Sequence, residues 1–241
     1  MKSWSRRDLS IINIDQNSLV IACDSCAGVG AKSGDTVKIS PYYAGKFTAR
    51  VALTEVICSG AWPIALTNGV TAEMKPTGQE IIRGIHAELA NAGLKDILVN
   101  GSTEENFPSL LTGLAITVIG QAAAADLKFG SATAGDKLIL WGKPSVGAEV
   151  DLDSAGFYDA VTHLLPLSGV KEIVPVGSKG IAYEVRALAA LSQKVAQLYQ
   201  TGIDYHKSAG PATCLVVLCD QTLVEQVLSY YPISTIIGEI L

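Results

Sequence analysis

A polar segment with two adjacent glutamates separates two apolar runs near the middle of the chain. Residues 97–99 and 114–119 have the composition of buried strands, and residues 100–108 between them are mostly polar. Loops between rigid strands often hold functional groups, and adjacent carboxylates suit a hard cation such as Mg²⁺. Glu104 and Glu105 therefore indicate either a magnesium site or an exposed acidic turn, and the spacing alone does not separate the two.

The composition is typical of a folded protein with a large core. The chain has 241 residues, 49% of them hydrophobic and 17% charged, with a formal net charge of −5. This length predicts one or two domains. Without a basic block or aromatic residues interleaved with basic ones, we expect no nucleic-acid partner. Without an apolar run near the roughly 20 residues of a membrane span, or a leader-like N-terminus, we expect a cytoplasmic protein that binds no membrane.

The five cysteines lie within or beside apolar runs. Their odd number and their spacing, which does not match a zinc site, predict reduced thiols that pack as small hydrophobic groups. Cys23 and Cys26 form a C-x-x-C pair, for which a redox or zinc role is the alternative. The three histidines are scattered without local partners, which disfavours hydrolysis by a nucleophilic triad.

Hydrophobic periodicity predicts mixed helices and strands in two halves. We expect strands over residues 9–14, 18–23, 97–100, 114–120, 136–142, 213–218 and 235–237. We expect helices over residues 44–59, 77–92, 157–165, 181–199 and 222–229. Thr77 and Glu80 have the spacing of a capping box, and Gly93 is placed to end the second helix. The small-residue stretch 121–135 predicts a boundary between domains 1–125 and 126–241.

Three other positions could carry chemistry. Asp24 ends an apolar strand and begins a glycine loop, which suits either a metal ligand or a turn cap. Glu55 lies in an otherwise apolar helix, and because burying an unpaired carboxylate is costly, it either faces solvent or meets a cation. Residues 177–180 precede a helix N-terminus and form either an anion site or a simple turn.

Taken together, these segments resemble the aminoimidazole ribonucleotide synthetase-like (PurM-like) superfamily. The similarity lies in the strand ending at Asp24, the helix containing Glu55, the phrase Gly60-Ala61-Trp62-Pro63, the run 100–103 and the loop 177–180. The resemblance implies an α+β, two-domain architecture. Its N-terminal domain would be a half-barrel that pairs in a homodimer, its C-terminal domain would be α/β, and ATP would lie in the cleft between them.

Within the superfamily, residues 102–108 and 175–181 are most similar to α-ribazole kinase. This resemblance implies an ATP- and Mg²⁺-dependent phosphotransferase that acts on a nucleoside, namely α-ribazole, in cobalamin lower-ligand salvage. Two alternatives stay open. One is another ATP-dependent member of the superfamily, such as a thiamine-monophosphate kinase-like enzyme, and the other is a non-catalytic nucleotide-binding dimer.

The resemblance also implies roles for individual residues. The magnesium ligands would be Asp24, Glu55, Glu104 and Glu105. The nucleotide and phosphate contacts would come from Lys32, Lys46, Asn68, Gly101, Thr103 and Lys179. The sequence departs from the family pattern, since Glu55 stands where aspartate is usual, Ser102 replaces an acid, and Asn68 takes a place often held by aspartate. No general base is identifiable.

Overall fold

The structure, a computed structural model, describes residues 2–241 and divides into two compact units. The N-terminal unit contains the described residues up to Val56, together with Ala61–Ala124 and Asp151–Gly156. The C-terminal unit contains Ile57–Gly60, Ala125–Val150 and Phe157–Leu241. The sequence did not indicate the two short segments, 57–60 and 151–156, that cluster with the opposite unit from their neighbours.

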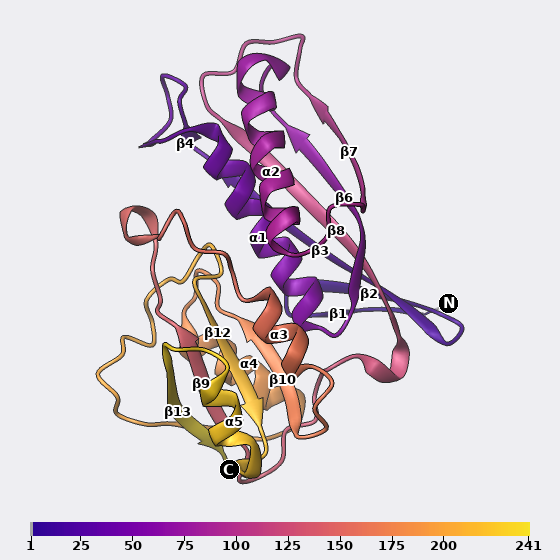
Figure 1. The fold of residues 1–241 in the computed structure, drawn as a ribbon, viewed down its shortest axis with the longest axis vertical. Coiled ribbons are helices and arrows are strands. Elements are labelled where there is room, and N and C mark those ends of the chain that lie inside the picture. The colour runs from indigo at the N-terminus through magenta and orange to yellow at the C-terminus, as the bar shows by residue number, and fades with distance from the viewer. Residues whose placement is uncertain (1) are drawn as a thin grey trace. The chain divides into compact units, whose positions relative to one another are not determined.

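The N-terminal unit is a six-stranded sheet of order β1-β2-β3-β8-β6-β7, with helices α1 and α2 on one face (Figure 1). Its main strands are β1 (Lys2–Arg6), β2 (Leu9–Ile14), β3 (Asn17–Ala27), β6 (Trp62–Val70), β7 (Leu98–Thr103) and β8 (Gly113–Ala123). Its helices are α1 (Pro41–Cys58) and α2 (Gln79–Asn91), and the short strands β4 (Val29–Gly30) and β5 (Val37–Lys38) form a separate pair. All neighbours in the large sheet are antiparallel except β6 and β7.

Successive residues of each strand alternate between the two faces of this sheet. We call the face under α1 and α2 the covered face; it holds fully buried residues such as Val20, Leu66 and Ile116. We call the opposite face the open face, where Cys23, Thr67 and other residues of the same strands are exposed. The strands predicted over residues 9–14 and 18–23 are thus confirmed as β2 and β3, but β3 continues to Ala27, so Asp24 lies within the strand and does not end it.

Glycines bring α1 and α2 close together. A Cβ at Gly45 would lie 2.1 Å from the Ile81 carbonyl oxygen, and one at Gly84 would lie 1.9 Å from the Tyr42 carbonyl oxygen. Any side chain at these two positions would push the helices apart. The predicted end of α2 at Gly93 is confirmed, because Gly93 has a φ of 70°, which glycine adopts without strain.

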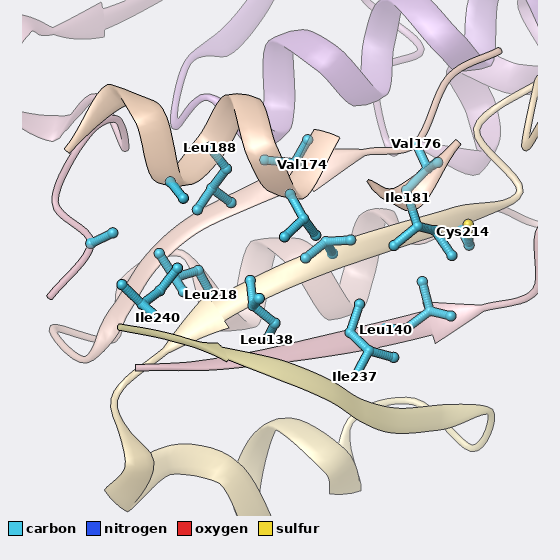
Figure 2. Packing of buried hydrophobic residues seen from close by; sticks show 14 of the residues in the cluster. Leu138, Leu140, Val174, Val176, Ile181, Leu188, Cys214, Leu218, Ile237 and Ile240 are labelled. Atoms are coloured by element: carbon cyan, nitrogen blue, oxygen red, sulfur yellow. The ribbon is translucent and has the colours of Figure 1, made fainter. Parts of the chain in front are cut away.

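The C-terminal unit is built on an antiparallel five-stranded sheet of order β10-β12-β9-β13-β11. Its strands are β9 (Lys137–Gly142), β10 (Val170–Pro175), β11 (Ala196–Leu198), β12 (Cys214–Cys219) and β13 (Ser234–Ile240), and its helices are α3 (Tyr158–Leu164), α4 (Ile181–Leu191) and α5 (Val224–Ser229). Figure 2 shows the core where Ile181 and Leu188 of α4 meet Val174, Leu138 and Leu218 of the sheet.

Two predictions of local structure were wrong. The helix expected over residues 181–199 ends at Leu191, because Gln193 has a φ of 56° and residues 196–198 pair with β13 instead. Thr77 does not cap α2; it lies in the π-helical segment Met74–Gly78, and its hydroxyl donates to Glu73 Oε1 at 2.5 Å. Between residues 2 and 241, no helix combines the length and the apolar character needed to cross a membrane.

Candidate functional site

A hollow in the N-terminal unit lies at one end of its sheet. It is a cavity of about 580 Å³ that is lined mainly by the ends of β3, β6, β7 and β8. Ser25, Ala115, Gly69 and Ser102 all line it, and the strand register places these four residues in one row across neighbouring strands. Glu104 lines the cavity just beyond β7. The volume falls within the range of small-molecule pockets.

The acidic loop begins three residues later than expected, because the predicted strand ended at residue 100. Because β7 extends to Thr103, the residues Gly101, Ser102 and Thr103 lie in a strand and not in a loop. Glu104 Oε1 then accepts hydrogen bonds from the Asn106 and Phe107 amides, at 2.7 and 3.3 Å. The Glu104 carboxylate therefore fixes the turn that follows it and also borders the cavity.

Glu105 is held by different groups. Its Oε1 accepts the Met74 amide at 2.7 Å and the Thr103 hydroxyl at 2.9 Å. Asp35 anchors the far end of the same loop, since its two carboxylate oxygens accept the Thr112 amide at 2.7 Å and the Thr112 hydroxyl at 2.8 Å. These hydrogen bonds hold both ends of the loop in place beside the cavity.

Asp24 lies on the covered face, because it is one residue away from Ser25 on β3. Burial, with a smaller contribution from the charge of Asp8, raises the pKa of Asp24 to about 6. Burial and then the Asp24 charge raise the pKa of the nearby Cys26 thiol, which also lines the cavity. A raised carboxylate pKa means that the negative charge at Asp24 lacks full compensation, which a bound cation would supply.

Glu55 is buried and paired with a protein cation. Its Oε2 lies 3.4 Å from Nη1 of Arg7, and the two side chains are 9% and 5% exposed. The sequence left open whether Glu55 faces solvent or pairs with a cation. The structure shows the pairing, and the cation is Arg7. Sequence reasoning missed Arg7 because it lies 48 positions away, in the turn between β1 and β2.

The predicted phosphate-binding lysines also have protein partners. Lys32 Nζ donates to Glu73 Oε2 at 2.6 Å, and this bond, with that from Thr77, lowers the pKa of Glu73 to about 2. Lys46 Nζ donates to the Leu152 carbonyl at 2.7 Å, and burial lowers its pKa. In the C-terminal unit, Lys179 Nζ lies 4.3 Å from the centre of the Tyr183 ring.

Asn68 and Gly101 act together on the covered face. The Asn68 side-chain amide donates to the Asn100 carbonyl at 3.1 Å. A Cβ at Gly101 would lie within 2.6 Å of three Asn68 side-chain atoms, so glycine is needed for Asn68 to take this position. The two residues therefore support the end of β7, and Asn68 is only 8% exposed.

The candidate metal ligands are not gathered into one preformed cluster. Within residues 2–241, no group of three or more His, Cys, Asp or Glu side chains is arranged to hold a metal ion. Cys23 and Cys26 lie three residues apart on one strand, so they point to opposite faces, which rules out a shared zinc ion or a disulfide between them. The thiols of Cys58, Cys214 and Cys219 are buried.

Residues 6–122 match the family described as AIR synthase related protein, N-terminal domain. The match covers slightly less than half of the chain. No curated protein sequence matches the chain significantly.

Several solved structures share the fold over nearly the whole chain. T. maritima PurL complexed with AMPPCP has a TM-score of 0.72 and 14% identity, and the similarity covers 96% of this chain but only 42% of PurL. E. coli HypE has a TM-score of 0.71 and 19% identity, covering 92% of this chain and 79% of HypE. A chain of the HypE–HypF complex has a TM-score of 0.70 and 18% identity, covering 95% of this chain and 86% of that one. This chain thus spans less than half the length of PurL.

The chain thus has the PurM-like, two-domain α+β fold expected from its sequence.

Proposed function

We propose that the chain is an ATP- and Mg²⁺-dependent kinase for a nucleoside-like small molecule, with α-ribazole as the candidate acceptor and α-ribazole 5′-phosphate as the product. The observation that carries the nucleotide part is the fold shared with T. maritima PurL, whose structures are described as complexes with AMPPCP, ATP and ADP. The acceptor part rests on the resemblance of residues 102–108 and 175–181 to α-ribazole kinase, together with the small-molecule cavity that Ser102 borders.

In this reaction the acceptor 5′-oxygen forms a bond to the γ-phosphorus, while the bond from that phosphorus to the β–γ bridging oxygen breaks. ADP leaves, and the hydroxyl proton passes to solvent. Phosphoryl transfer needs mainly correct positioning and neutralisation of the phosphate charge. The protein therefore needs groups that hold the acceptor, the triphosphate and its metal ion, and it does not need a covalent nucleophile.

Magnesium usually keeps several waters and binds proteins through one or two carboxylates plus substrate phosphates. The dispersed carboxylates of this chain fit that mode better than an all-protein cage. Asp24 is the ligand we favour, because its raised pKa marks a negative charge that a cation would stabilise. Glu104 and Glu105 are further candidates, whereas Glu55 is already paired with Arg7. Bound magnesium would neutralise part of the triphosphate charge.

Lys32 and Lys46 would bind phosphate by exchanging their present protein partners for it. Lys32 and Lys46 are bound to Glu73 and to the Leu152 carbonyl, so either lysine would have to leave that partner to reach a phosphate. Lys179 stands in the loop before α4, where backbone amides favour an anion, and remains the candidate phosphate contact of the C-terminal unit.

We also propose that the chain forms a homodimer through the open face. Away from the cavity, this face carries a row of larger apolar residues, which are Ile21, Ile119, Ala65 and Leu98 in register. Leu98 is 69% exposed, and the nearby Trp62 is 54% exposed. Such a patch is typical of a protein–protein contact.

The experiment that tests the kinase proposal measures ADP release from ATP and Mg²⁺, with and without α-ribazole, and identifies the product by mass. We expect riboside-dependent ADP and an equal amount of phosphorylated riboside. Asp24→Asn should lower kcat at least about 100-fold, as expected when a charge-stabilising group is lost. Asp96→Asn, at an exposed aspartate outside the proposed site, is the matched control and should keep wild-type turnover.

Full turnover by Asp24→Asn would contradict the metal assignment. The absence of ADP release with α-ribazole and with thiamine monophosphate would contradict the kinase proposal. It would instead favour a second candidate function, a non-catalytic nucleotide-binding dimer. The observation in favour of that candidate is that Ser102 and Asn68 stand where the family has acids and no three-carboxylate cluster exists among the described residues. Calorimetry with ATP would then show binding without hydrolysis.

A further inference from the structure

The open face of the N-terminal sheet has two halves that differ in side-chain size. In one row, Ile21 of β3 pairs with Ile119 of β8, and Ala65 and Leu98 continue the row on β6 and β7. Two rows further along, toward the cavity, the equivalent positions are Ser25, Ala115, Gly69 and Ser102. We call these the apolar half and the small-residue half.

The small-residue half forms the floor of the cavity. Its four residues reach no further from the backbone than a serine hydroxyl, and they lie on four neighbouring strands. With about 4.8 Å between neighbouring strands, the row is about 14 Å long. A floor of this length, built from backbone, one methyl group and two short hydroxymethyl groups, matches the face of a planar ring better than it matches a branched or strongly charged group. The cavity above it encloses about 580 Å³.

Gly69 gives an independent indication of a ligand. A Cβ at Gly69 would meet no atom within 4 Å, and the residue does not have a left-handed φ. By contrast, a Cβ at Gly113 would lie 2.5 Å from the Thr71 hydroxyl oxygen. Glycine inside a strand weakens it and often marks the close approach of a ligand. Because neither packing nor backbone conformation requires glycine at position 69, its missing side chain serves to leave the cavity open.

The rim of the cavity carries a carboxylate, whereas its floor carries no charged group. Glu104 borders the cavity, and hydrogen bonds from the backbone amides of Asn106 and Phe107 hold its carboxylate in place. Thr103, the last residue of β7, also lines the cavity beside Glu104. Cys26 lines the cavity near Asp24, so the hollow reaches the strand end at which we place the metal ligand. A molecule in this cavity would therefore meet apolar atoms on its face and hydrogen-bonding groups on its edge.

We propose that this cavity is the acceptor subsite and that it holds the planar aromatic base of the acceptor. The base lies with its face on Gly69 and Ala115, and the ribose hydroxyls, which can donate to a carboxylate, lie toward Glu104. This inference rests on the proposed kinase function, and it adds the place on the sheet where the base of the acceptor binds. It predicts that the protein selects acceptors with a flat heteroaromatic base and binds the sugar alone poorly.

The test adds a side chain to the floor of the cavity at position 69. Gly69→Leu places a side chain in the cavity, and Gly69→Ala, which adds one methyl group without a clash, is the second variant if the larger one does not fold. Thr67→Val is the matched control, because Thr67 is exposed on the same strand and face but does not line the cavity. Calorimetry with α-ribazole, benzimidazole, ribose and ATP is combined with thermal unfolding of each variant.

We expect wild type to bind α-ribazole and benzimidazole but to bind ribose much more weakly. Gly69→Leu should weaken α-ribazole binding at least about tenfold, Gly69→Ala should weaken it less, and Thr67→Val should leave it within about twofold. ATP affinity should stay within about twofold in all three variants. Unchanged α-ribazole affinity in Gly69→Leu, or in Gly69→Ala if that variant alone folds, would overturn the proposal. So would a wild type that binds neither α-ribazole nor benzimidazole.

This design separates the two proposals. Suppose that wild type binds α-ribazole, that the Gly69 substitutions abolish this binding, and that wild type releases no ADP. The subsite proposal then stands and the kinase proposal fails. If ADP release depends on α-ribazole but is insensitive to the Gly69 substitutions, the kinase function stands and the subsite fails.

Discussion

The covered and open faces of the N-terminal sheet belong to the same strands but use charge and size in opposite ways. Between α1 and α2, the helices that pack on the covered face, Arg50 Nε lies 2.6 Å from Glu88 Oε1, and the two side chains are 3% and 0% exposed. On the other side, exposed residues divide into an apolar half and a small-residue half. Residues of the covered face are fixed by packing, whereas those of the open face are not needed to fill a core. The side-chain choices on the open face therefore report function more directly.

The largest effect should come from the two helices that pack on the covered face. Glu88→Ala leaves Arg50 buried without its carboxylate, although the Ser154 hydroxyl and carbonyl still accept from Arg50 at 2.7 and 2.6 Å. Removing one partner of a buried ion pair costs about 3–5 kcal/mol, so we expect a loss of that order in the free energy of unfolding, measured with urea. Glu80→Ala on the same helix, whose pair with Arg83 is exposed, should cost less than about 1 kcal/mol. Equal losses in the two variants would contradict the comparison.

A smaller effect should come from Asp24, and it should depend on pH. The pKa of Asp24 is about 6 in the folded chain and 3.8 in the unfolded reference. Below pH 3.8 the carboxyl is protonated in both states and has no effect. As the pH rises from about 4 to 6, the unfolded chain ionises first, so the folded state loses stability, and the loss is complete above pH 6. Its size is on the order of 2 kcal/mol.

Asp24→Asn should therefore be more stable than wild type at pH 8 and nearly equal to it at pH 4. The measurement is the difference in the free energy of unfolding between variant and wild type at pH 4, 6 and 8, without nucleotide. A difference that does not change with pH would show that the Asp24 carboxylate is not strained by burial, and it would remove the physical reason for placing a cation there.

The smallest effect on folding should come from the apolar half of the open face. Leu98→Lys changes a residue that is 69% exposed, so thermal unfolding should move little. Its effect should be on assembly: losing the burial of one leucine at the proposed interface should weaken the dimer about tenfold or more. Sedimentation across a concentration series measures this, with Val195→Lys, at a residue 67% exposed in the C-terminal unit, as control. A monomeric wild type, or an unaffected Leu98→Lys dimer, would contradict the assembly proposal.

Much of the fold could be predicted because its signals are local. The alternation in β2 and β3, the long apolar stretch of α1 and the glycine after α2 each depend on a few neighbouring residues. The failures arose where a distant partner decided the outcome. Residues 196–198 continue a helical pattern, but pairing with β13 makes them a strand. Thr77 has the sequence of a helix cap, but Glu73 takes its hydroxyl.

The candidate site was predictable in its parts and not in its arrangement. The sequence indicated Asp24 and Glu104, and the structure gives the first a strained charge and places the second on a cavity rim. It did not indicate that Arg7 would neutralise Glu55, because that contact joins two elements far apart in the chain. Nor did it single out Gly69, whose meaning depends on the empty space above it.

The most direct test measures backbone amide chemical shifts by NMR while Mg²⁺–AMPPCP and α-ribazole are added. We predict that α-ribazole changes the chemical shifts of residues around the cavity, at 25–27, 69–71, 102–104 and 113–115. The shifts of Ile21 and Ile119, at the centre of the apolar half, should stay unchanged. Perturbations confined to the apolar half or to the C-terminal unit would contradict the claim that the small-residue half of the open face is the functional one.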